Sequence, residues 1–138
     1  MGSRRQAREQ ALQILYGHAV NPGELRKAID DYFASVPRDE ESRRYAERLV
    51  LGVEEHRDEI DGRLRGIVKN WSLGRIGLVD LSILRLAIFE MTYEREVPSP
   101  VAINEAIEIA KRYGSEQSSR FINGVLDKAR AEAADEAD

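Results

Sequence analysis

The sequence of 138 residues contains no cysteine, which excludes disulfides, thiolate metal sites and cysteine nucleophiles. Only two histidines are present, His18 and His56, and neither follows a glutamate by three residues, the spacing used in carboxylate metal sites of helical bundles. A glycine-rich phosphate loop and a serine nucleophile elbow are also missing. We therefore expect neither an enzyme nor a protein with a cofactor or metal.

Long hydrophobic runs are missing as well. The most apolar segment, 76–91, is interrupted by Asp80, Arg85 and Glu90, which excludes an ordinary membrane span. The basic N-terminal end is not followed by the apolar run of a signal peptide. Together with the lack of cysteine, these features predict a cytoplasmic protein that does not associate with membranes.

Acidic residues outnumber basic ones, 25 to 21, but the basic residues are unevenly distributed. The net charge is −4, with a pI of about 5.3, which by itself argues against a nucleic-acid partner. However, Arg4, Arg5 and Arg8 lie together near one end, whereas the last seven positions of the chain hold four acidic residues and no basic one. A helix would bring the three guanidinium groups to one end of one face, where they could bind phosphates. The alternative is a solvated N-terminal turn that only aids solubility.

Apolar residues recur at intervals of three and four along most of the chain, which predicts amphipathic helices. The expected helical segments are 4–18, 25–36, 39–67, 76–91, 99–113 and 115–129. We expect Asp39 to cap the third segment, and a break near 56–59 because its apolar stripe exceeds an ordinary helix. Segment 76–91 is apolar nearly all round and is predicted to lie in the middle of a bundle. No alternating strand pattern is present, so the chain is predicted to be a single all-α domain.

The last two segments carry specific end signals. Ser99 is predicted as the N-cap of the first and Pro100 as a first-turn residue. Gly114 is predicted to end that helix in the left-handed conformation, and Ser115 to cap the next. Trp71, in the preceding connection, is predicted to anchor neighbouring helices.

Several side chains allow two interpretations. Tyr16 and Phe121 could stack on unpaired bases or belong to the core, and we favour the core for Tyr16. Glu105 and Glu108 are interpreted as solvated helix positions.

The order of side chains in the last hairpin carries more information than its helical pattern. VAINEAIEIAKRYG (101–114) followed by FINGVLDK (121–128) strongly resembles the C-terminal half of the NusB family, bacterial transcription antitermination factors. RRQAREQALQILY (4–16) is similar to the arginine-rich opening of that family. Further blocks agree in order, namely Gly52-Val53, Ile60-Asp61 and 79–90, and the resemblance is lost only in 20–45 and the tail.

The resemblance implies an all-α, NusB-like bundle of about seven helices in two packed three-helix subdomains. One RNA-binding domain would span 1–138, with an N-terminal subdomain at 1–72, a C-terminal subdomain at 73–130 and a flexible acidic tail at 131–138. The implied function is to bind the boxA segment of nascent ribosomal-RNA transcripts together with NusE, a small-subunit ribosomal protein. The resulting complex would help RNA polymerase read through terminators, without catalysis by this chain.

The resemblance also implies site residues. Those for RNA are Arg4, Arg5, Arg8, Gln13, Tyr16, Ser115, Gln117, Ser118, Arg120, Phe121 and Asn123. Those for NusE are Tyr16, Asp80 and Arg85. Two alternatives stay open: Arg85 could form an internal ion pair with Glu90 or Asp80, and Asn123 could satisfy backbone groups beside Gly124, whose missing side chain would permit close helix contact.

Two other functional classes remain. NusB-like domains also precede the catalytic domain of some ribosomal-RNA cytosine methyltransferases, but no methyl-donor-binding domain follows here, so we expect the free-standing factor. A helical scaffold that binds only protein is the third hypothesis. Because some relatives have a denser basic run than these three arginines, we predict modest affinity for RNA alone and tighter binding with NusE. The sequence leaves open whether the chain is a monomer or a homodimer.

Overall fold

The computed structural model describes residues 3–37, 39–69 and 73–137, which form seven α-helices, one 3₁₀ turn and no strand. The all-helical prediction is therefore confirmed. The helices are α1 (Ser3–Val20), α2 (Leu25–Ala34), α3 (Glu40–Glu55), α4 (Arg57–Ile67), α5 (Leu78–Tyr93), α6 (Ser99–Tyr113) and α7 (Ser118–Ala137), and the 3₁₀ turn is Leu73–Arg75.

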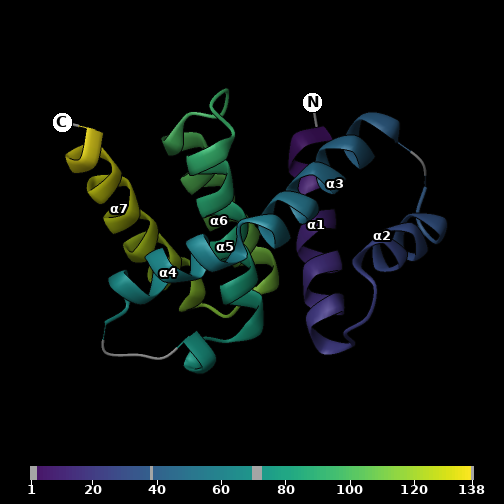
Figure 1. Cartoon of the computed structure of the whole chain (residues 1–138), viewed down its shortest axis with the longest axis horizontal. Coiled ribbons are helices and arrows are strands. Elements are labelled where there is room, and N and C mark those ends of the chain that lie inside the picture. The colour runs from purple at the N-terminus through teal and green to yellow at the C-terminus, as the bar shows by residue number, and fades with distance from the viewer. Residues whose placement is uncertain (1–2, 38, 70–72, 138) are drawn as a thin grey trace.

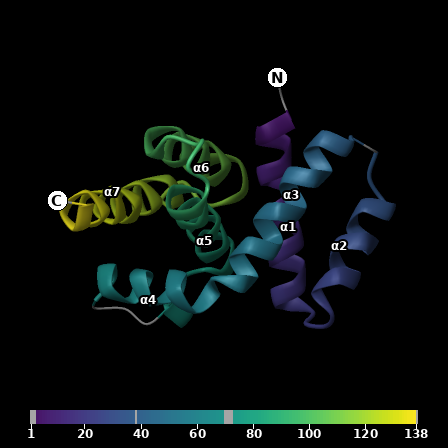
Figure 2. The same ribbon diagram turned by 45° about the horizontal axis from the view of Figure 1, so that its top comes forward.

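The helices form two groups around α5. Helices α1, α2 and α3 gather on one side, and α4, α6 and α7 on the other (Figures 1 and 2). Helix α5 packs against α1, α3, α4, α6 and α7. Helix α1 packs most extensively on α3, and α6 on α7. The core is thus continuous between the two groups.

Helix α5 occupies the centre because its sequence has no polar face. Its buried residues come from every side of the helix, and Leu84 and Ile88 are fully buried. Burial of a side chain of this size contributes about 1.5–3 kcal/mol before the cost of ordering it. The prediction of a central apolar helix is confirmed.

The predicted break in the third segment is confirmed at His56, which separates α3 from α4. The side chain of Asp39 accepts a hydrogen bond from the backbone N–H of Ser42 at 3.3 Å, so the predicted cap of α3 is also confirmed. The ring of His56 stacks on Tyr93 of α5, with 3.8 Å between ring centroids. This contact fixes the position of the break against the central helix.

Helix α3 approaches α5 closely at Gly52. A Cβ atom at this position would lie 2.2 Å from Cζ of Phe89, far inside van der Waals contact. A residue without a side chain is therefore required where these two helices cross.

The predicted start of α6 is wrong by one residue. The helix begins at Ser99 itself, and Pro98 occupies the N-cap position without a side-chain cap. Pro100 lies in the first turn, as predicted, where its missing N–H is not needed.

The predicted end of α6 also needs correction. Gly114 is extended, with φ −100° and ψ −168°, and not left-handed. Glycine is required there because a Cβ atom would lie 2.6 Å from Oγ of Ser118 and 2.9 Å from the carbonyl oxygen of Ala110. Gly124, expected at a close helix contact, instead faces open space, since no heavy atom lies within 4 Å of the position that a Cβ would occupy.

Helix α7 continues to Ala137, so the predicted boundary between helix and tail at residue 130 does not correspond to a helix end. Helix α4 packs against α5 and α7, on the side of the C-terminal helices. The subdomain boundary at 72/73 stays a prediction, and Trp71 lies outside the described residues. Within the described segments, no helix combines the length and apolar character needed to span a bilayer.

Candidate nucleic-acid interface

Two of the three arginines of the N-terminal cluster lie at the surface of α1. The guanidinium of Arg4 lies over the ring of Tyr45, 3.9 Å from its centroid. Arg5 donates two hydrogen bonds to the carboxylate of Glu105 on α6, at 3.0 and 2.6 Å, and its side chain remains 56% exposed. These hydrogen bonds and the charge of Arg5 lower the pKa of Glu105, against the opposing effect of its partial burial. Both arginines are accessible to a phosphate.

Arg8 is used inside the protein. Its side chain is 7% exposed, and its Nε donates to both carboxylate oxygens of Glu90, at 2.9 and 3.0 Å. The hydroxyl of Tyr45 donates to the same carboxylate, and burial together with this hydrogen bond raises the pKa of Tyr45. Arg8 also reaches Glu105 at 3.4 Å. Its guanidinium is therefore directed into the core and not toward solvent, unlike the expected phosphate contact.

Glu105 differs from its predicted role as a solvated helix position. Its side chain is 15% exposed and bridges Arg5 and Arg8. The sequence could not reveal this because the contact joins residues about a hundred positions apart.

Polar contacts between α1 and α6 continue toward the predicted bend. Arg112 donates to Glu9 at 3.1 Å, and the Tyr113 hydroxyl donates to the same carboxylate at 3.0 Å. The amide of Gln13 donates to the Tyr113 hydroxyl at 3.2 Å and accepts from the hydroxyl of Tyr32 at 2.8 Å. We call this row, with Arg5 and Glu105, the α1–α6 seam.

The seam fixes where the bend lies. Because Arg5 pairs with Glu105 and Gln13 with Tyr113, α1 and α6 run in the same direction, from the end where the N-terminus lies (Figure 1). The bend between α6 and α7 starts directly after Tyr113, beside the middle of α1. Glu9 and Tyr113 were not predicted as site residues. The only sequence signal was the position of Tyr113 immediately before the glycine that ends α6.

The bend exposes most of its predicted RNA-binding residues. The exposed ones are Ser115, Gln117, Arg120 and Asn123. Ser118 is buried, and its hydroxyl accepts the backbone N–H of Ser115 at 2.9 Å. Ser118 thus stabilises the bend and does not offer its hydroxyl to solvent. Ser115 lies before α7 and is not its side-chain cap.

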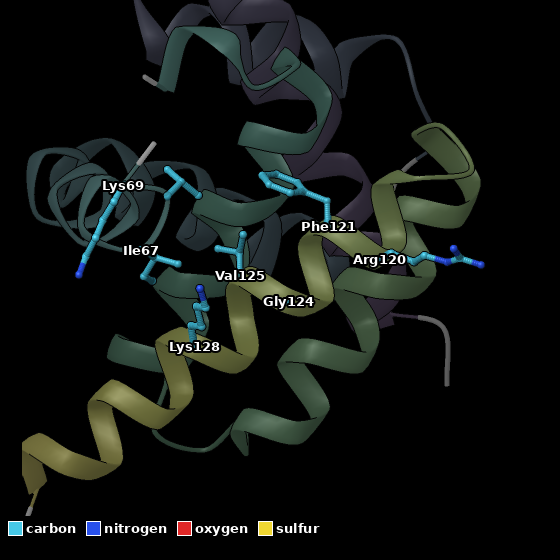
Figure 3. A pocket seen from close by; sticks show the side chains of 8 residues that line it. Ile67, Lys69, Arg120, Phe121, Gly124, Val125 and Lys128 are labelled. Carbon is cyan, nitrogen blue, oxygen red and sulfur yellow. The ribbon is translucent and has the colours of Figure 1, made fainter. Parts of the chain in front are cut away.

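Phe121 is partly buried and faces α4 (Figure 3). It lines a cavity of about 350 Å³ between the end of α4 and the first turns of α7. The other lining residues are Ile67, Val68, Lys69, Arg120, Gly124, Val125 and Lys128. Arg120 borders the cavity, but its guanidinium extends to the opposite side of α7 from the ring of Phe121 (Figure 3).

The residues predicted to bind NusE lie on α1 and α5. Tyr16 is 42% exposed, so the preference for a core position is wrong. Asp80 is half-buried in the first turn of α5. Arg85 forms an internal ion pair, but its partner is Asp61 of α4, through hydrogen bonds of 2.8 and 2.9 Å, and neither Glu90 nor Asp80. Only 11% of the Arg85 side chain is exposed.

Known proteins match this chain over nearly its whole length. The model of the NusB family matches residues 5–131. The transcription antitermination protein NusB of Trichlorobacter lovleyi is 47% identical over 136 residues, covering 99% of this chain and 96% of the relative. That of Geobacter sulfurreducens is 48% identical over 132 residues, covering 93% of this chain and 94% of the relative.

Solved structures agree with these relatives. NusB of T. maritima superposes with a TM-score of 0.83 at 35% identity, covering 91% of this chain and 88% of that chain. A chain of a crystal structure of the antitermination factors NusB and NusE in complex with dsRNA gives a TM-score of 0.83 at 25% identity, covering 93% of this chain and 96% of that chain. These relatives are antitermination factors and not enzymes, in agreement with the lack of a catalytic constellation in the sequence. By sequence and by fold, the chain belongs to the NusB family.

Proposed function

We propose that this protein binds the boxA segment of nascent ribosomal-RNA transcripts jointly with NusE, and that the complex helps RNA polymerase read through terminators. Family membership supports the antitermination role, and the related complex of NusB, NusE and dsRNA supports the two partners. The observation that carries the RNA-binding proposal is the α1–α6 seam. Its hydrogen bonds between α1 and α6 hold the α6–α7 bend beside α1, the helix on which Arg4 and Arg5 are exposed.

The contacts divide by chemistry. Arg4 and Arg5 would neutralise phosphates, because a guanidinium forms paired hydrogen bonds with phosphate oxygens. The exposed polar residues of the bend, Ser115, Gln117, Arg120 and Asn123, would contact the bases and backbone of an unpaired strand. Arg8 and Ser118 would act by holding α1 and the bend in place. The exposed ring of Tyr16, with Asp80 and the edge of Arg85, would contact NusE.

Titration of fluorescently labelled boxA RNA, with and without NusE, tests the proposal. With only two exposed arginines in the cluster, we expect modest affinity for RNA alone and clear tightening when NusE is present. Replacing Arg4 and Arg5 by alanine should weaken RNA binding and leave NusE binding intact. Equal affinity with and without NusE would refute joint recognition, and an unchanged affinity of the double variant would favour the scaffold that binds only protein.

A further inference from the structure

A hollow between α1 and α6 extends from Arg5 toward the bend. Its volume is about 300 Å³, and it is lined by residues from the first turns of α1 and the last turns of α6. The lining residues are Arg5, Glu9, Glu108, Ile109, Lys111 and Arg112. Because α6 runs beside α1 and ends at the bend, an RNA strand that contacts both Arg5 and the bend would pass over this hollow.

Positive charge exceeds negative charge in the hollow, although the chain as a whole has a net charge of −4. Arg5 comes from α1, and Lys111 and Arg112 come from α6, against two carboxylates. The side chains of these three cations are between 56% and 68% exposed. A concave surface with an excess of positive charge attracts anions, so the hollow favours a phosphate group as its ligand.

Both arginines of the hollow keep N–H groups for a ligand. Arg112 uses only Nη1, which donates to the two carboxylate oxygens of Glu9 at 3.1 and 3.2 Å. Its Nε and Nη2 donate to no residue in the described part of the chain. Arg5 uses Nε and Nη2 for Glu105, which leaves its Nη1 without a partner among the described residues. Two guanidinium groups on different helices can therefore donate to the several oxygens of one phosphate.

The carboxylate of Glu9 does not prevent such a contact. The hydroxyl of Tyr113 also donates to Glu9, at 3.0 Å. Burial and this hydrogen bond raise the pKa of Tyr113, so the hydroxyl keeps its proton at neutral pH. The side chain of Arg112 is exposed, and ion pairs of exposed side chains contribute little to stability. Arg112 can thus turn to a phosphate while Glu9 keeps its hydrogen bond from Tyr113.

We propose that this hollow binds one phosphate of the RNA backbone, between Arg5 of α1 and Arg112 of α6, with Lys111 at its edge. The inference rests on the proposed function and deepens it, because it adds α6 to the phosphate-binding surface. Arg112 takes the place of Arg8, whose guanidinium is directed into the core. The arginine surface is completed by a residue about a hundred positions away from the N-terminal cluster.

Arg112→Gln tests the phosphate contact. Lys27→Gln is the matched control, because Lys27 is also an exposed helical cation paired with one carboxylate, and α2 lies on the other side of α1 from α6 (Figure 2). With NusE present, Arg112→Gln should lower the slope of log K against log salt by about 0.7, the value for one phosphate contact with a single strand. A fourfold rise in salt should then cost the wild type about 2.6-fold more affinity than the variant. Lys27→Gln should keep the wild-type slope, and thermal melts verify that both variants are folded.

Neutral methylphosphonate linkages separate a phosphate contact from an indirect effect of Arg112 on the bend. Each linkage of boxA RNA is replaced in turn, with the same RNA carrying an ordinary 2′-deoxy linkage at that position as the reference. One neutral linkage should weaken binding to the wild type by a larger factor than binding to Arg112→Gln, because the variant has already lost the contact. A variant that only displaced the bend would lose affinity by the same factor for every RNA.

The outcomes separate this inference from the proposed function. If Arg112→Gln keeps the wild-type slope, or if no neutral linkage distinguishes it from the wild type, while Arg4→Ala/Arg5→Ala loses affinity, the inference is wrong and the proposed function stands. Equal losses of slope in Arg112→Gln and Lys27→Gln would also overturn the inference, since only net charge would matter. If the wild-type protein fails to bind boxA RNA with NusE present, both are overturned.

Discussion

Replacing Arg8 by methionine separates a structural arginine from an RNA-binding one. Arg8 lies in the arginine cluster at the start of α1, yet its guanidinium forms a buried pair with Glu90, which is 2% exposed. Methionine preserves much of the apolar length of the side chain and removes the charge. The variant leaves the Glu90 carboxylate in the core without its cation.

Removing one partner of a buried ion pair costs about 3–5 kcal/mol, because the remaining charge is not compensated. Glu90 would keep the hydrogen bond from Tyr45, so we expect a loss of about 3 kcal/mol in the free energy of unfolding, at the lower end of that range. Arg4→Ala should cost no more than about 1 kcal/mol, because it removes only an exposed contact with the ring of Tyr45. Replacing Arg8 and Glu90 together by methionine and leucine should restore most of the loss.

Urea denaturation of the wild type, the two single arginine variants and the double variant measures these differences. The salt dependence of boxA RNA binding, measured without urea at salt concentrations at which each variant is folded, gives an independent readout. Arg4→Ala should lower its slope by about 0.7, and Arg8→Met should leave the slope unchanged. If Arg8→Met were as stable as Arg4→Ala and lowered the salt slope equally, Arg8 would contact a phosphate of the RNA. The buried ion pair of Arg8 with Glu90 would then be contradicted.

Three further results are expected. Gly52→Ala should lower the melting temperature, because the added Cβ collides with the ring of Phe89; an unchanged melt would contradict the close crossing of α3 and α5. Glu105→Gln should tighten boxA RNA binding about threefold more than Glu108→Gln, a control with the same charge change, because it releases Arg5 from its carboxylate partner. Equal effects of the two variants would show that only net charge matters. Because the fold lowers the pKa of Glu105, its ionised carboxylate stabilises the protein at pH values above the ordinary pKa of 4.5. This contribution is lost as the pH falls through the lowered pKa. The stability difference between wild type and Glu105→Gln should therefore shrink below about pH 4.5, and a constant difference would argue against this ion pair.

Local features of the fold could be predicted from the sequence because they depend on neighbouring residues. The cap at Asp39, the break at His56 and the central position of α5 follow from side-chain chemistry and apolar spacing within one or two turns. Gly114 shows the limit of such reasoning. Its need for glycine comes from the close approach of Ser118, and the sequence favoured the more common reason, a left-handed helix end.

The candidate site was harder to predict, because spacing on a helix does not reveal what packs against each face. Arg5 and Arg8 lie within one turn of each other, yet one faces solvent and the other Glu90, 82 positions away. Arg85 similarly pairs with Asp61, whereas the sequence suggested acidic residues on the same helix. The family resemblance identified the helices that form the surface, and the structure was needed to separate exposed cations from buried ones.

A single RNA-binding surface formed by α1 and the bend is tested most directly by photo-cross-linking. Here boxA RNA substituted with a photoreactive uridine is cross-linked in the presence of NusE, and the cross-linked peptides are identified by mass spectrometry. One RNA strand should cross-link to peptides from both the first turns of α1 and the bend at 115–123. Cross-links confined to one of these regions, or found only on α2, would contradict the claim that α1 and the bend form a single RNA-binding surface.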